Sequence, residues 1–142
     1  MNNLRFATII HILVLAYKSK LNAKTFSDEM VITSDFIAGS INVNPVVVRR
    51  EIKFLKEAGI LESKKGKDGG CYLVKEANEI SFGDLFQLIN NEGKFGKLNH
   101  PNPKCPVGNK MNGELKNLYQ SVENEIINSL NHTTLKEFAD RF

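Results

Sequence analysis

Basic side chains near the middle of this sequence are the groups best suited to bind another molecule. Residues 44–75 carry eight Lys and Arg residues but only four Asp and Glu residues. This excess is larger than the net charge of +3 of the whole chain of 142 residues. By contrast, residues 114–142 carry three basic and five acidic residues. Clustered Lys and Arg bind the phosphates of nucleic acids, so the pattern predicts a half that binds a polyanion, with a merely solvated basic helix as the alternative.

The two cysteines are the other side chains with reactive chemistry. Cys105 lies beside Lys104 and near Lys110, whose charges favour the thiolate, so it is a candidate redox sensor. An inert loop cysteine is the alternative. Cys71 lies between a glycine and Tyr72, which is more typical of a small packed residue than of a second sensor. A disulfide between the two stays open, but two cysteines are too few for a disulfide framework and indicate a reducing cytosol.

Catalytic and metal-binding patterns are absent from the sequence. The stretch 66–70 is rich in glycine but lacks the spacing and the following helix of a phosphate-binding loop. His100 and Cys105 are too few to form a metal site. We therefore expect no enzyme, no catalytic residue and no metal, with a Cys105 nucleophile as the enzymatic alternative.

Helices must position the basic residues. Apolar spacing predicts a buried helix over residues 3–18 and a short helix from Thr33 or Ser34 to about residue 40, with Phe36 on its buried face. A further helix begins at Asn44-Pro45, because Asn caps a helix and Pro fits its first turn, and Gly59 ends it. Two short helices joined by a tight turn, the second carrying cations, predict a helix-turn-helix.

A basic hairpin is predicted directly after this second helix. Ile60-Leu61 opens one strand, residues 66–70 turn, and residues 71–74 return as the partner strand. Three lysines lie at or near the turn, namely Lys64, Lys65 and Lys67. A basic hairpin in this place is a wing, so the expected fold is mainly α with a small β wing.

The rest of the chain is predicted to be helical apart from one stretch. Ser81 caps a helix that ends near residue 90, and Thr134 begins a short terminal helix. From Leu115 to Leu130, apolar residues recur every three or four positions, which predicts an amphipathic helix. A domain this small cannot cover it, so a second subunit is the expected partner, with folding back on its own domain as the alternative. The expected divisions are a winged helix-turn-helix domain at 1–90, an irregular linker or sensor loop at 91–112, and dimerisation and terminal helices at 113–142.

The side chains expected to contact DNA lie on the capped second helix and on the wing. Arginine suits bidentate contact with guanine or a phosphate, and exposed valines near the helix start could touch thymine methyl groups. Lysines further along and on the wing would bind the backbone. Which arginine reads a base stays open. The expected set is Asn44, Val46, Val47, Arg49, Arg50, Lys53, Lys64, Lys65 and Lys67.

Taken in order, several segments resemble the Rrf2 family of bacterial transcription regulators. Besides the first helix, they are Val43-Asn-Pro-Val-Val-Val-Arg-Arg50, Leu55-Lys-Glu-Ala-Gly-Ile-Leu61, the wing ending Gly-Gly-Cys-Tyr72, Glu79-Ile-Ser-Phe-Gly-Asp-Leu85 and Asn102-Pro-Lys-Cys-Pro-Val-Gly108. The resemblance covers residues 3–140. It implies a homodimer joined through the long C-terminal helix, which binds a pseudo-palindromic operator in double-stranded DNA.

Several members of that family hold an iron–sulfur cluster on three closely spaced linker cysteines. Only Cys105 stands in that region here, so we expect no cluster and no other cofactor. The pattern around Cys105 looks more like the cluster-free branch, whose signals include thiol oxidation and small molecules. Cys71 departs from the family, because a third glycine is usual at its position.

The expected function is therefore a cytoplasmic, homodimeric, sequence-specific DNA-binding regulator, acting as a repressor and responding to an oxidant or another effector. A winged-helix module that binds a protein and not DNA is the alternative. The apolar run of residues 6–16 is too short to span a membrane, and His11 within it disfavours a signal peptide. The operator, the regulated genes, the effector and the choice between repression and activation stay open.

Overall fold

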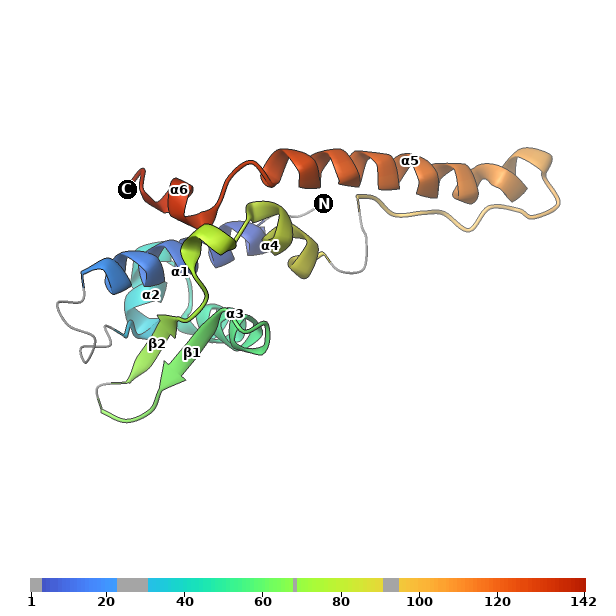
Figure 1. Ribbon diagram of the computed structural model, residues 1–142. Coiled ribbons are helices and arrows are strands. Elements are labelled where there is room, and N and C mark those ends of the chain that lie inside the picture. Colours follow the sequence, from blue (N-terminus) through green and yellow to red (C-terminus); the bar gives the residue numbers. More distant parts are fainter. Residues whose placement is uncertain (1–3, 23–30, 68, 91–94) are drawn as a thin grey trace.

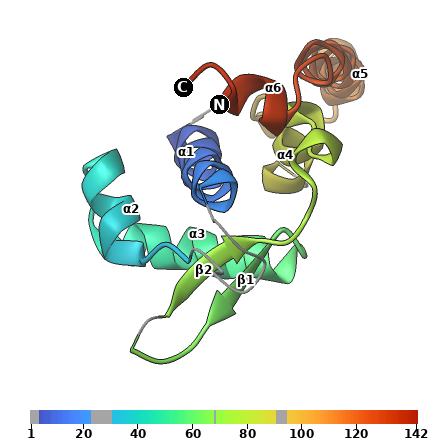
Figure 2. The same cartoon turned by 60° about the vertical axis from the view of Figure 1, so that its left-hand side comes forward.

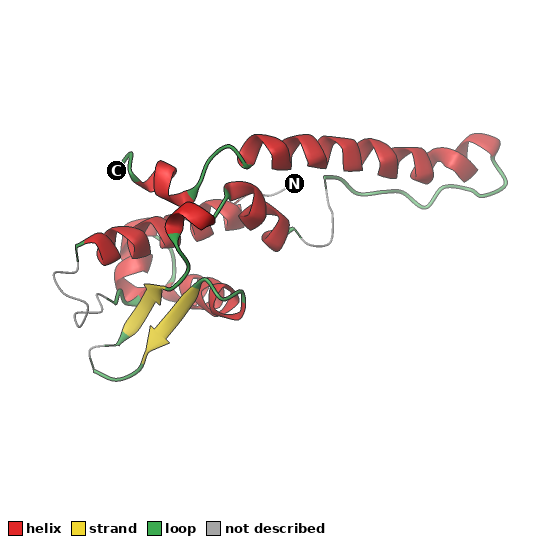
Figure 3. Cartoon of the chain, in the orientation of Figure 1, coloured by secondary structure: helices red, strands yellow, loops and turns green. Residues whose placement is uncertain are grey.

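The computed structural model describes residues 4–22, 31–67, 69–90 and 95–142 of the chain. These residues form helices and one two-stranded antiparallel sheet (Figure 3). The expected class, mainly α with a small β wing, is confirmed.

The first helix, α1 (Leu4–Leu21), is the centre of the fold, with α2 and α3 on one side and α4 and α6 on the other (Figure 2). Ile9, Ile12, Leu13 and Ala16 are buried on it, and their spacing of three or four residues places them on one stripe. The helix expected over residues 3–18 is therefore present, and it extends to Leu21.

The helix-turn-helix consists of α2 (Ser34–Ile41) and α3 (Pro45–Glu57). The Thr33 hydroxyl caps α2 by accepting a hydrogen bond from the Phe36 N–H at 3.1 Å. Asn42 ends α2 in the left-handed region, with φ of 63°, a conformation that Asn tolerates better than most residues. Phe36 corrects an expectation: its side chain is 60% exposed, because α2 presents Ile37 and not Phe36 to the core.

The wing is formed by β1 (Leu61–Lys64) and β2 (Gly70–Leu73), which pair in antiparallel fashion as expected. Gly66 in the turn has φ of 107°, a conformation that side chains disfavour. Ile32 forms an isolated bridge with Cys71, so the chain before α2 is fastened to β2.

The C-terminal half follows the expected order, with the bounds η1 (Ala77–Glu79), α4 (Phe82–Ile89), α5 (Pro106–Leu130) and α6 (Leu135–Ala139). The Ser81 hydroxyl caps α4 by accepting from the Asp84 N–H at 3.0 Å. The Thr134 hydroxyl caps α6 by accepting from the Glu137 N–H at 3.2 Å. Both caps match the sequence prediction.

The long helix α5 begins at Pro106, inside the stretch expected to be an irregular linker. Cys105 is its N-cap and Pro106 occupies its first turn, where a missing N–H costs nothing. The next residues are mostly exposed and polar, including Asn109 and Lys110, so this turn of helix has the composition of a loop. Figure 1 shows α5 and the segment directly before it extending well beyond the other helices and the sheet, and none of the residues of α5 is buried. No helix in the described part of the chain has the length and apolarity needed to cross a bilayer.

Candidate DNA-binding surface

The outward face of α3 carries most of the residues expected to contact DNA. The Asn44 side chain caps this helix by accepting from the Val46 N–H at 2.9 Å, so its amide oxygen already has a structural role. Val46 is 64% exposed near the helix start, whereas Val47 is only partly exposed. Lys53 is exposed further along the same helix. The face therefore offers an apolar group at its start and a cation farther on.

Arg49 reaches across to α2. Its Nε donates a hydrogen bond to the Ser34 hydroxyl at 3.3 Å, and its Nη2 lies 3.5 Å from Asp35 Oδ1. The Arg49 and Asp35 side chains are 58% and 77% exposed, so water screens this ion pair. Arg49 is thus held only loosely and can change partner.

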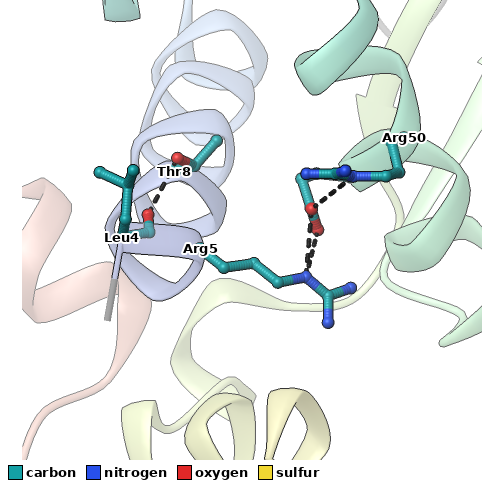
Figure 4. Close-up of polar contacts among 5 residues, drawn as sticks. Leu4, Arg5, Thr8 and Arg50 are labelled. Carbon is teal, nitrogen blue, oxygen red and sulfur yellow. Dashed lines mark hydrogen bonds and ion pairs between the residues drawn. The ribbon is translucent and has the colours of Figure 1, made fainter. Parts of the chain in front are cut away.

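Arg50, in contrast, approaches a buried carboxylate. Its Nε lies 3.4 Å from Glu51 Oε1 (Figure 4). The Nε of Arg5, from α1, lies 2.9 Å from Glu51 Oε2 and 3.1 Å from Oε1. Neither Glu51 nor Arg5 was expected at the site. Glu51 falls three residues after Val48 and four before Leu55, both buried, and this spacing marks it as facing the core.

The wing and α3 together line a cleft of about 540 Å³. The cations on its wall come from both elements and are Arg49, Lys53, Lys56 and Lys64. Lys65 and Lys67 are exposed on the turn beyond the cleft. Of the predicted residues, the structure therefore brings Arg49, Lys53 and Lys64 together at this cleft, whereas Asn44, Val46, Val47 and Arg50 do not line it and Lys65 and Lys67 lie at the wing tip.

The two cysteines differ in their surroundings. Cys105 is exposed, and its Sγ accepts a hydrogen bond from the Gly108 N–H at 3.5 Å. The backbone N–H groups of Gly108 and Val107 lower the pKa of the Cys105 thiol. Cys71 is buried in β2, and burial raises the pKa of its thiol to about 11. Both thiols are free, so the disulfide left open by the sequence is not formed within this chain.

The donor set of one chain does not fit an iron–sulfur cluster. Such a cluster is held by several thiolates, and the chain has only two cysteines, one buried in the wing and one exposed at the start of α5. Among the residues that the structure describes, no three His, Cys, Asp or Glu side chains gather in a way that could hold a metal ion.

Comparison with known proteins agrees with this geometry. Residues 9–141 match the Rrf2 family model, which is described as an iron-dependent transcriptional regulator. A Bacillus subtilis (strain 168) protein named "Putative HTH-type transcriptional regulator YwnA" is 38% identical over 138 residues, covering 96% of both chains. The crystal structure "of a putative DNA binding protein" has 36% identity and a TM-score of 0.70, covering 94% of this chain and 97% of that one.

A more distant solved structure shows the same fold. CymR (YrzC), the global cysteine regulator of B. subtilis, has a TM-score of 0.69 at 18% identity, covering 100% of this chain and 98% of that one. The winged arrangement of α2, α3 and the β1–β2 hairpin, together with the match over almost the whole chain, leads to one identification. The chain belongs to the Rrf2 family and is a DNA-binding transcriptional regulator.

Proposed function

We propose that this regulator binds double-stranded DNA with α3 in the major groove and the wing against the backbone. The main support for this proposal is one cleft that is lined by four cations from α3 and the wing. An α-helix fits the major groove, where side chains near its N-terminus reach base edges. Asn44, Val46, Val47, Arg49 and Arg50 occupy that end of α3, while Lys53 and the wing lysines bind phosphates.

A homodimer is part of the proposal. No residue of α5 is buried. Its large apolar side chains Val107, Met111 and Leu118 are 41–65% exposed. The C-terminal end of α5 packs on α4, where Ser81 donates a hydrogen bond to Asn131 at 3.1 Å. A second copy would cover the apolar residues that this packing leaves in water. Two copies related by a two-fold axis match a pseudo-palindromic operator.

We further propose a repressor that is released when Cys105 is oxidised. Cys105 is exposed and its pKa is lowered, which are the two properties that make a thiol reactive toward oxidants. Such a regulator works where the chromosome is, in line with a cytoplasmic location, and needs no catalytic group.

The test is fluorescence anisotropy with duplex DNA from upstream of the protein's own gene, and an unrelated duplex of the same length as control. Affinity for the first duplex should fall steeply with salt, by about 0.9 logarithmic units per logarithmic unit of salt for each phosphate neutralised. Arg49→Ala and Arg50→Ala should each weaken binding, by about 1–3 kcal/mol where a base contact is lost. Mild oxidant should release wild-type protein but not the Cys105→Ser variant. A flat salt response with both duplexes would instead indicate a protein-binding module.

A further inference from the structure

Glu51 is a carboxylate buried inside the helix proposed to read DNA. Its side chain is 1% exposed, whereas Arg49 and Arg50 just before it are 58% and 71% exposed. A buried carboxylate is unfavourable unless it is paired and hydrogen-bonded. The buried position of the Glu51 carboxylate therefore depends on the groups that pair with it.

Arg5 of α1 supplies the main partner. Its Nε contacts both carboxylate oxygens of Glu51, at 2.9 and 3.1 Å (Figure 4). Its guanidinium also stacks 4.3 Å from the centroid of the Phe54 ring, one turn further along α3. The Arg5 side chain is thereby held at two points of α3, and the Glu51 carboxylate is held in one orientation.

Among the described residues, the carboxylate also contacts the Arg50 side chain. Arg50 Nε lies 3.4 Å from Glu51 Oε1, while the Arg50 side chain as a whole is exposed. The guanidinium of an arginine is planar, so a contact at Nε orients the terminal nitrogens at the other end. These terminal nitrogens are the pair that can contact guanine O6 and N7 together. Arg49 instead contacts Ser34 and Asp35 on α2, and the Asp35 carboxylate is 77% exposed, so water screens that ion pair more than it screens the buried Glu51 carboxylate.

We propose that Arg5 and Glu51 are positioning residues for DNA reading. They fix the guanidinium of Arg50 before DNA arrives, so Arg50 reads a base, while the loosely held Arg49 moves to a phosphate. An arginine that is already oriented loses less conformational freedom on binding. This inference rests on the proposed function, and it identifies which of the two arginines recognises a base.

The experiment is a double-mutant cycle on the full chain. The probe is a duplex selected by wild-type protein from a random-sequence library, together with the same duplex carrying each single base-pair change. Glu51→Leu removes the carboxylate and places an apolar side chain at a buried position. It is measured alone, with Arg50→Ala, and with Arg49→Ala as the matched control. Circular dichroism and thermal unfolding establish that each variant is folded, and Glu51→Gln takes the same place in the cycle if Glu51→Leu does not fold.

Glu51→Leu is expected to weaken binding to the selected duplex by roughly tenfold and to reduce discrimination at one base pair of each half-site. In the Arg50→Ala background the same change should have no further effect, whereas in the Arg49→Ala background the full loss should persist. Arg49→Ala itself should weaken binding to all duplexes alike. An equal loss in both backgrounds, or no loss in any, would overturn the inference while leaving the proposed function intact. If wild-type protein selects no duplex, the proposed function itself fails.

Discussion

At the scale of single residues, the charged side chains of this molecule differ mainly in how exposed they are to water. The wing lysines are exposed, so they add affinity that salt can screen. Glu51 and its partner Arg5 are 1% and 40% exposed, so their interaction is stronger and also costs more to break. The same contrast separates the buried thiol of Cys71 from the exposed thiol of Cys105.

Removing one partner of the buried pair should destabilise the fold. Arg5→Ala leaves Arg50 as the partner of the Glu51 carboxylate in the part of the chain that the structure describes, and we expect the free energy of unfolding to fall by about 2 kcal/mol. The double variant Arg5→Leu/Glu51→Leu removes both charges, and its stability should equal or exceed that of wild type. Urea unfolding followed by circular dichroism measures both. A double variant that is less stable than Arg5→Ala would contradict the prediction.

The two thiols should react with iodoacetamide at different rates. Because the Cys105 pKa is lowered, its thiolate forms at a lower pH, and its alkylation should reach half its maximal rate at a lower pH than that of a free cysteine in an unstructured peptide. Cys71 should stay unmodified in the folded protein, since it is buried with a pKa of about 11. Mass spectrometry of the alkylated protein across a pH series makes the measurement. The Cys105→Ser variant is the control and should show no rapid labelling.

The sequence predicted the outward-facing residues of α3 better than the residues that pair with them. Asn44 and Pro45 mark where the helix begins, and from there helical spacing predicts which side chains face outward. Glu51 could have been found by the same spacing, but a charged residue is normally assigned to the surface. Arg5 could not, because 46 positions separate it from Glu51 and only the packing of α1 on α3 brings them together.

At the scale of elements, the junction between α4 and α5 depends on close approach at Gly83. A Cβ atom at this position would collide with the Asn131 side chain and the Ile127 carbonyl oxygen at the end of α5. The junction is reinforced by the hydrogen bond from Ser81 to Asn131. The close packing of α5 on α4 therefore depends on a position with no side chain.

Gly83→Ala should loosen this junction and lower the free energy of unfolding by about 1–3 kcal/mol, because the added methyl group forces the two helices apart. Gly39→Ala is the matched control. Gly39 lies in α2 with open space around it, so alanine there should stabilise the helix by up to about 1 kcal/mol. Urea unfolding of the two variants distinguishes them, and equal shifts in the same direction would contradict this account.

The elements themselves were largely predictable, and the exception has a physical cause. Caps at Thr33, Asn44, Ser81 and Thr134 locate the starts of four helices, because each side chain satisfies a free N–H in the first turn. The start of α5 was missed although Val107 and Met111 continue the apolar spacing of Leu115 and Leu118 toward the N-terminus. The Asn, Gly, Lys and Pro residues around them are common in loops, and this composition outweighed the spacing.

At the scale of the whole molecule, α5 exposes apolar side chains that the rest of the described chain does not cover. Its outer part is accompanied by the segment before it, where the Phe95 and Tyr119 rings meet edge-on with centroids 5.5 Å apart. Leu118 on α5 is nonetheless 57% exposed. Exposed apolar side chains gathered on one helix are typical of a surface that another molecule covers.

Leu118→Glu should therefore convert the proposed dimer into a monomer, because a carboxylate would have to enter an apolar interface. Sedimentation equilibrium gives the mass, and anisotropy should show weaker DNA binding, since one monomer reaches only one half-site. Lys116→Glu lies on nearly the opposite side of the helix and should leave the mass unchanged. A wild-type protein that sediments as a monomer, or a Leu118→Glu variant that stays dimeric, would refute pairing through this face.

The length of α5 has a consequence for the DNA that such a pair could recognise. A helix of 25 residues measures about 37 Å, close to the pitch of about 34–36 Å of one turn of B-DNA. In two copies paired along this helix, the length of α5 would set the distance between the two α3 helices that contact DNA. Inserting seven residues would add two helical turns, about 10 Å, without rotating the paired face much. The lengthened protein would fold and pair, yet its preferred operator would be one with the half-sites moved apart.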